Sequence, residues 1–308
     1  MAKEFFTETA QERFLAGKSP AMQLLTLHRG LAHFNTSRLA VSCPTPQWRD
    51  LLADEMAWRL QEGEFLEALR EDVALSLPPA ELDADGFMAW FEHLAHNGPG
   101  QQHRLFKWLA QSATTDDMKW FLRQEAAGEA GFDDLLAYTQ VKLPVGPKLE
   151  LARNYWDEMG HGKPKAMHGA MLAAAVEELK LQPSIATTVW PALALSNTML
   201  GLAMSRRYTY HSLGVLGVVE LTAPTRVKLV SDGMRRLGMN GRIRSYFDLH
   251  AVLDVHHSEA WNREVIRPLV AADPAFARFI AEGALMRLVC GQRCFDCYAD
   301  QLMPQAWH

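Results

Sequence analysis

The chain has 308 residues, of which 48% are hydrophobic and 22% are charged, the proportions of an ordinary globular protein. Its net charge of −5 argues against a nucleic-acid partner, because nucleic acid requires a basic protein face. No stretch approaches the roughly 18 apolar residues of a membrane span, and the partly acidic N-terminus lacks the apolar core of a signal peptide. We therefore expect a cytoplasmic protein that does not bind a membrane.

Helical patterns follow one another along the chain, and Val, Ile and Thr never form the alternating run that a strand needs. We predict helices over residues 21–32, 47–74, 80–96, 101–113, 115–140, 146–160, 164–180, 183–205, 209–222, 225–237 and 241–260, and a last pair from residue 262. The strongest early turn signal is Asn97-Gly98-Pro99-Gly100. The sequence thus predicts an all-α protein, with residues 1–100 as an N-terminal helical extension packed on a main helical domain at 101–308.

The first chemical signal lies in the predicted helix at 115–140. Phe121, Glu125, Glu129 and Phe132 recur at helical spacing, so two glutamates interrupt an otherwise aromatic and aliphatic stripe. One or both carboxylates therefore face the interior. We prefer Glu129 as a candidate metal ligand because it is nearer the middle of the stripe, and we keep Glu125 as its alternate.

The second signal is a break between two helices. Glu158 ends one predicted helix, and Pro164 is placed like the first residue of the next, so that His168 follows about one turn later. Such a break would let Glu158 and His168 converge on one metal. His161 is the competing ligand, because Glu158-x-x-His161 has the spacing of ferritin-like di-iron bundles; the glycines on either side of it disfavour a regular helix there, so we prefer His168.

A buried carboxylate is predicted in the next segment. Nine residues without an acidic or basic side chain, apart from His211, precede Glu220, and an unpaired carboxylate in such a run would cost several kcal/mol to bury. Glu220 therefore requires a partner or a metal ion. Just before this run, Arg206 and Tyr210 are candidates for binding a substrate, since an arginine can hold a carboxylate with a two-pronged hydrogen bond.

The most specific pattern lies in the predicted helix at 241–260. His250, Asp254 and His257 stand at i, i+4 and i+7, which stacks all three side chains on one helix face. His256 points elsewhere, so the stripe is selective. Two imidazoles and a carboxylate on one face suit a transition metal better than a hydrophobic core.

Charge counting favours two metal ions. The four preferred carboxylates would offset the charge of two Fe(II) ions, and the three imidazoles would add neutral donors. Mixed carboxylate and imidazole donors suit iron or manganese, whereas zinc sites usually have fewer ligands. The full candidate set is Glu129, Glu158, His168, Glu220, His250, Asp254 and His257.

This ligand pattern resembles that of the haem-oxygenase-like di-iron oxidases and oxygenases, a family also called iron-containing redox enzymes. The likeness runs from about residue 110 to 265 and rests on Glu129 or Glu125, on Glu158-x-Gly160-x-Gly162 followed by His168, on Glu220, and on His250-x3-Asp254-x2-His257. It implies a haem-oxygenase-like helical bundle that binds two iron ions and activates O2 with an external electron donor. It also implies oxidation of a small amine- or amino-acid-derived substrate, by N-oxygenation or by oxidative C–C or C–N cleavage, in natural product biosynthesis.

An alternative function is a non-catalytic, ferritin-like iron-binding protein. It would use Glu158-x-x-His161 together with Asp254-x-x-His257, but it leaves His250 unexplained.

A haem-binding relative of the same fold would instead need a lone axial histidine on an N-terminal helix, where His28 and His33 are available.

The expected partners of the di-iron enzyme are a small-molecule substrate and a redox partner or chemical reductant. The N-terminal extension could also form the contact of a homodimer.

Overall fold

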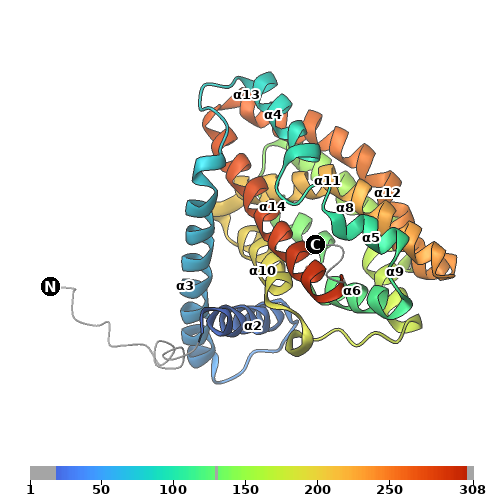
Figure 1. Ribbon diagram of the computed structural model, residues 1–308. Helices are drawn as coiled ribbons and strands as arrows, with labels where there is room; N and C mark the ends of the chain where they lie inside the picture. Colours follow the sequence, from blue (N-terminus) through green and yellow to red (C-terminus); the bar gives the residue numbers. More distant parts are fainter. Residues whose placement is uncertain (1–18, 129–130, 304–308) are drawn as a thin grey trace.

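The computed structural model describes residues 19–128 and 131–303. Within these residues the chain is helical and has no strand, which confirms the predicted all-α class (Figure 1). The α-helices are α2 (Pro20–Leu39), α3 (Trp48–Val73), α4 (Ala84–Asn97), α5 (Arg104–Gln111), α6 (Thr115–Gly128), α7 (Phe132–Thr139), α8 (Val145–Glu158), α9 (His168–Glu178), α10 (Trp190–Met204), α11 (Thr209–Arg236), α12 (Gly241–Trp261), α13 (Arg267–Ala272) and α14 (Ala275–Leu302).

Side chains at several helix starts accept hydrogen bonds from backbone N–H groups that have no partner within the helix. At the start of α4, Oδ1 of Asp83 accepts from the backbone N of Gly86 at 2.8 Å. At the start of α12, Oδ1 of Asn240 accepts from the backbone N of Arg242 at 2.9 Å and of Ile243 at 3.2 Å. This cap sets where α12 begins, and α12 carries three of the candidate ligands.

The central helix of the bundle is α11, which packs along α12 on one side and α14 on the other (Figure 1). It crosses α14 closely because a glycine of each helix lies at the contact. A Cβ atom on Gly214 would lie 2.0 Å from the carbonyl oxygen of Ile280, and one on Gly283 would lie 2.0 Å from that of His211. Any larger residue at either position would push the two helices apart. This crossing helps to bury the first half of α11, which contains Glu220.

Two predicted helix boundaries are wrong. The helices expected at 209–222 and 225–237 are one helix, α11, with Pro224 inside it. Proline removes a backbone donor and usually ends or kinks a helix, but here packing along α12 and α14 holds the chain helical on both sides. Conversely, the helix expected at 115–140 is divided into α6 and α7, and Gly131 before α7 has a left-handed φ of 72°.

The apolar core has two parts, and both border on α11. The larger part joins α3, α4, α10, α13 and α14, and the smaller part joins α5, α6, α12 and the end of α14. Among the N-terminal helices, α2 packs on α10 and α3 runs beside α14 (Figure 1). The division of the chain at residue 100 into an extension and a main domain remains a prediction.

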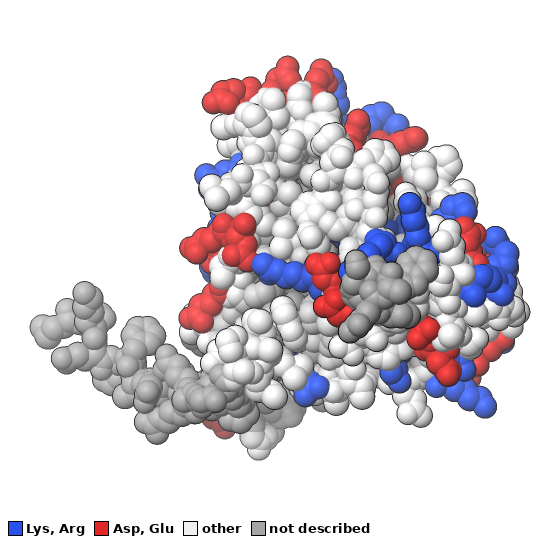
Figure 2. All heavy atoms as spheres, in the orientation of Figure 1, with Lys and Arg blue, Asp and Glu red and all other residues white. Residues whose placement is uncertain are grey.

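The surface and the helix lengths bear on the expected partners. Among residues 19–128 and 131–303, no helix combines the length and the apolar character that a membrane crossing requires. On the face drawn in Figure 2, basic and acidic side chains are interspersed, and no extended area carries one sign of charge.

Candidate metal centre

Six of the seven preferred ligands come together in two triads. One triad consists of Glu158, His168 and His250, and the other consists of Glu220, Asp254 and His257. In each triad, the potential ligand atoms lie within 4.8 Å of one another. These residues come from α8, α9, α11 and α12, so the centre is assembled from four helices.

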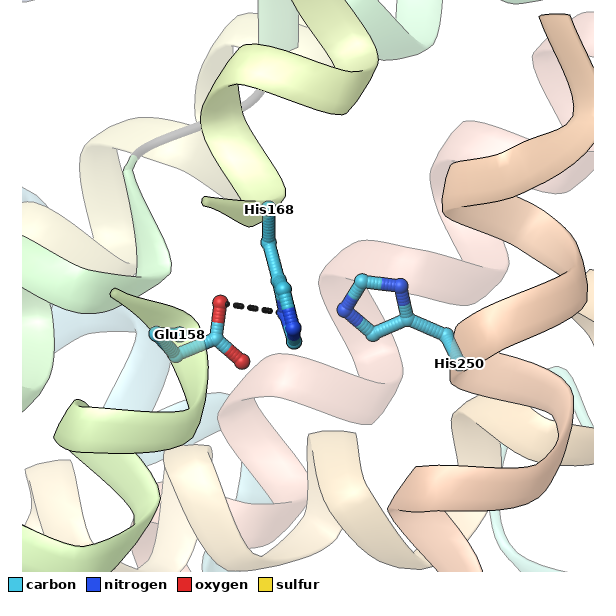
Figure 3. A group of neighbouring side chains, drawn as sticks. All are labelled: Glu158, His168 and His250. Atoms are coloured by element: carbon cyan, nitrogen blue, oxygen red, sulfur yellow. Dashed lines mark ion pairs between the residues drawn. The ribbon is translucent and has the colours of Figure 1, made fainter. Parts of the chain in front are cut away.

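In the first triad, Glu158, His168 and His250 point toward one another from three different helices (Figure 3). A tight turn after α8 makes this possible, because residues 160–162 all have left-handed φ values. A Cβ atom on Gly160 would lie 2.3 Å from the carbonyl carbon of Ala166, so only glycine permits this close approach. The turn places His168 beside the end of α8. We predicted His168 about one turn into the next helix, but it is the first residue of α9.

The second triad lies between α11 and α12. Glu220 is 2% exposed, and its Oε1 accepts a hydrogen bond from Nδ2 of Asn154 at 2.7 Å. Its Oε2 lies 3.5 Å from Nδ1 of His257. Asp254, one turn before His257 on α12, is also buried. The carboxylate predicted to be buried in the apolar run of α11 is therefore buried beside the helix that presents the histidines.

The triads hold carboxyl groups that resist ionisation. Burial and the nearby Glu220 raise the pKa of Glu158 to about 9. The same two causes raise the pKa of Asp254 to about 9. Without a cation, both groups therefore retain protons at neutral pH, because the crowded buried site disfavours further negative charge. A divalent cation would displace these protons and balance the charge.

The histidines of the first triad are neutral donors. Burial and the nearby His257 lower the pKa of His168 to about 4, and burial and His168 lower the pKa of His250 to about 4. Nδ1 of His250 donates a hydrogen bond to the backbone carbonyl of Tyr246 at 2.7 Å, which leaves the lone pair of the neutral ring on Nε2. Nδ1 of His168 lies 2.8 Å from Oε2 of Glu158, without hydrogen-bond geometry. Such neutral, oriented imidazoles are suitable metal ligands.

His257 is oriented by a carboxylate that the sequence analysis missed. Its Nε2 lies 3.0 Å from Oδ2 of Asp157, and its buried Nδ1 has no hydrogen-bond partner among the described residues. Burial opposes the charged ring, but Glu220 and Asp157 outweigh this effect and raise the pKa of His257 to about 9. A carboxylate behind a ligating histidine is a common second-sphere arrangement. The only available signal was the position of Asp157 next to Glu158.

Asn154 was also missed as a partner of Glu220. It precedes Glu158 by one helical turn on α8, so the two side chains share a buried face. That spacing was visible in the sequence, but nothing local indicated that the face meets α11.

Taken together, the buried acids that hold protons, the neutral imidazoles of the first triad and the free Nδ1 atom of His257 fit a site for divalent iron.

The alternates and the seventh ligand have different positions. His161 is exposed and forms an ion pair with Asp157, so it contacts the outer carboxylate and not the first triad. Glu125 lines the cavity beside the triads, and burial raises its pKa. Glu129, the preferred residue of this pair, lies outside the described residues. His256 is exposed, as the stripe on α12 requires.

Neither proposed substrate residue reaches this centre. The guanidinium group of Arg206 donates to the carbonyl oxygens of Tyr138, at 3.0 Å, and of Val141, and so caps the end of α7. The Tyr210 ring stacks on Phe276 with 4.0 Å between centroids. Neither residue lines the cavity at the triads, so the structure gives the predicted substrate roles no support.

A cavity of about 160 Å³ adjoins both triads. Glu158, Glu220, His250 and Asp254 form part of its wall. Most of the remaining wall is apolar and includes Phe106, Phe121, Leu172, Met199, Val230 and Phe295. A small organic molecule in this cavity would be next to any metal held by the triads and largely shielded from water.

Comparisons with known proteins bear on the fold and the family. A crystal structure of a CADD-like protein of unknown function from Nostoc punctiforme has a similar fold, with a TM-score of 0.56, 18% sequence identity, and coverage of 72% of this chain and 99% of that chain. No curated protein sequence matches this chain significantly. The sequence profile of the iron-containing redox enzymes matches residues 119–292, more than half of the chain and all six residues of the triads. The chain therefore belongs to the iron-containing redox enzyme family.

Proposed function

We propose that this protein is a non-haem di-iron oxygenase or oxidase that uses O2 to oxidise a small amine- or amino-acid-derived substrate. The reaction would be N-oxygenation or oxidative C–C or C–N cleavage, with electrons from an external donor. The observation that carries the proposal is the pair of largely buried triads beside one cavity with a mostly apolar wall. A storage or transport protein has no need of an apolar chamber at its metal site.

In this proposal, each triad holds one iron ion, and Glu125 or Glu129 supplies a further carboxylate. Bound iron would supply the O2 chemistry, which no protein side chain provides. The chain would supply the ligand geometry, the exclusion of water and the orientation of the rings. The Tyr246 carbonyl orients the ring of His250, and Asp157 orients the ring of His257, because each accepts a hydrogen bond from one ring nitrogen and leaves the other for the metal.

The test begins with full-length protein freed of metal by a chelator and titrated with Fe(II) under nitrogen. We expect two iron ions per chain. O2 consumption is then measured with a chemical reductant, alone and with a panel of amines and amino acids. We expect at least one compound to stimulate O2 consumption and to appear as an oxidised product by mass spectrometry.

Two other outcomes would contradict the proposal. If iron binds but every compound leaves O2 consumption unchanged, the alternative of a non-catalytic iron-binding protein is correct. If the metal-free protein does not bind iron, the assignment of the triads is wrong. A matched control is His256→Ala, which changes an exposed histidine on the same helix and should leave both measurements unchanged.

A further inference from the structure

We infer that Arg226 and Arg287 form an anion-binding site inside the cavity, which holds the carboxylate of a small, largely apolar substrate such as an amino acid. This inference rests on the proposed function and narrows it, because it excludes simple amines without an acidic group. Arg226 comes from the second half of α11 and Arg287 from α14, so the two residues are distant in sequence. Both line the cavity that contains the triads.

Arg287 is a buried cation whose donors are not used. Its side chain is 8% exposed, and its Nε and Nη1 atoms have no hydrogen-bond partner among the described residues. Burying a guanidinium group without partners costs free energy, so evolution rarely retains such a group in a core without a use for it.

Arg226 is nearly as poorly paired. It is 9% exposed, and its one hydrogen bond to a described residue is a long one, from Nη1 to Oε1 of Gln101 at 3.3 Å. Its guanidinium carbon lies 5.5 Å from the centre of the Phe295 ring, which forms part of the cavity wall. None of the described carboxylates forms an ion pair with Arg226 or Arg287, although Glu125 lines the same cavity.

The charges of the cavity wall favour an anionic ligand. Among the described residues, four carboxyl groups line the cavity, those of Glu125, Glu158, Glu220 and Asp254. With two Fe(II) ions bound, the positive charge of the metals would equal the negative charge of these four groups. Glu125 is near enough to attract both arginines, but its single charge cannot balance two guanidinium groups and a metal ion, so the described cavity wall would keep an excess of positive charge. A carboxylate can accept hydrogen bonds from both guanidinium groups and reduce this excess charge.

The rest of the chamber indicates what the anion is attached to. Phe106, Phe121, Leu172, Met199 and Phe295 offer apolar contacts and few hydrogen bonds. A free inorganic anion would leave this apolar surface uncovered. A carboxylate on an aliphatic or aromatic body would fill the chamber and place that body against the triads.

The experiment is calorimetric titration of the full-length, metal-free protein, repeated with Fe(II) bound under nitrogen. The probes are a panel of amino acids and unbranched monocarboxylates, each paired with its primary amide, and inorganic phosphate. We expect at least one carboxylate to bind, and its amide to bind at least roughly tenfold more weakly, the loss expected for hydrogen bonds to a charged group. Arg226→Met and Arg287→Met should each lower the affinity for that carboxylate by roughly tenfold or more and leave the affinity for the amide unchanged.

Stability separates a binding role from a structural one. Arg287→Met removes an unpartnered buried charge, so the ligand-free variant should melt at the same temperature as the parent or higher. The matched control is Arg38→Met, since Arg38 is also buried but forms two hydrogen bonds with Glu62 outside the cavity. That variant should melt at a lower temperature and bind the carboxylate normally.

Several results would overturn the inference. One is equal affinity for carboxylates and their amides, and another is phosphate binding without carboxylate binding. A third is Arg287→Met that melts well below the parent and keeps full carboxylate affinity. If iron binds and amines stimulate O2 consumption while no carboxylate binds, the inference fails and the proposed function stands. If carboxylates bind at the two arginines and iron does not bind, the proposed function fails instead.

Discussion

Two buried clusters of carboxyl and imidazole groups border α11, and they differ in how their charge is balanced. In the cluster near the start of α11, Glu282 accepts hydrogen bonds from Nε of Arg70 at 2.8 Å and of Arg278 at 2.9 Å, and lies 2.8 Å from Nε2 of His211. Burial alone would raise the pKa of Glu282, but these three partners lower it to about 2. The carboxylate is thus ionised and fully paired within the protein.

The metal centre has similar residue types and the opposite balance. None of its described carboxyl groups forms an ion pair with a lysine or arginine, and the pKa values of Glu158 and Asp254 are raised to about 9. The comparison shows that residue types alone do not distinguish a structural ion network from a candidate metal site. The distinguishing feature is whether arginine side chains balance the buried acids, as at Glu282, or whether, among the described basic side chains, only histidines lie beside them, as at Glu220.

The largest expected difference between the two clusters is in iron binding. His250→Ala and Asp254→Ala each remove one donor of a triad, so we expect them to lose at least one of the two iron ions. Glu282→Gln should bind iron as the parent does, because its cluster already contains its cations. Iron content after gel filtration under nitrogen measures this. Loss of iron in Glu282→Gln with full iron in Asp254→Ala would reverse the two assignments.

In the metal-free protein, a substitution at Glu282 should lower the free energy of unfolding more than a substitution at Asp254 does, the reverse of their effects on iron binding. Glu282→Gln leaves two arginines and an imidazole without their acid, and should cost about 3 kcal/mol, the low end for breaking a buried ion pair, because Arg278 can return to solvent. Asp254→Asn replaces a carboxyl group that already retains its proton, and should change stability by less than about 1 kcal/mol. Urea denaturation measures both. A larger loss in Asp254→Asn would show that its carboxylate is ionised and structurally paired.

Metal should stabilise the protein, and pH should control how much. At free Fe(II) one hundred times the dissociation constant, linkage predicts a gain of about 2.7 kcal/mol. Thermal melting with and without Fe(II) under nitrogen measures this gain. Equal melting temperatures with iron shown to be bound would contradict it.

The pH dependence follows from three raised pKa values. Glu158, Asp254 and His257 retain protons in the folded state up to about pH 9, whereas the unfolded chain has released them above their usual values of 4.5, 3.8 and 6.5. Stability of the metal-free protein should therefore fall as pH rises from 6.5 to 9, by up to about 1.4 kcal/mol per pH unit for each retained proton. Fe(II) should flatten this slope, because it displaces the protons. A metal-free protein whose stability rises over that window would contradict these assignments.

A smaller effect should follow from the carboxylate behind His257. Asp157→Asn keeps the shape of the side chain but weakens its hold on Nε2 of His257, and should lower iron affinity by roughly tenfold to a hundredfold. A competing chelator can measure this affinity. The matched control is Asp232→Asn, which removes an acid from a surface ion pair with Lys228 and should leave iron affinity unchanged.

The smallest effect should come from His161. His161→Ala removes an exposed imidazole that contacts the outer acid Asp157 and stacks on Trp156, so iron content should stay within error of the parent and stability should change by less than about 0.5 kcal/mol. His168→Ala, which changes the first residue of α9, should lose iron. An iron-bound structure with His161 as a ligand and His168 turned away would contradict both expectations.

Helical periodicity alone predicts much of the candidate metal centre. The face shared by His250, Asp254 and His257 is a property of one helix, and a spacing of four and three residues defines it in any helical context. The run before Glu220, which has no acidic residue, Lys or Arg, similarly predicts that the carboxyl group of Glu220 is buried. The structure places these side chains as the spacing predicts, because each placement depends on a single helix; their role as metal ligands remains a prediction.

What the sequence by itself determined, therefore, is the all-α class and the residues that each helix presents on its buried face. Only the tertiary structure decided which faces meet. The left-handed turn at 160–162 brings His168 to Glu158 and turns His161 to solvent, packing carries α11 through Pro224, and the contact of α11 with α14 brings Arg226 and Arg287 to one cavity. The physical reason is that periodicity records the position of a side chain around its own helix, whereas convergence between helices depends on packing among residues that are far apart in the chain.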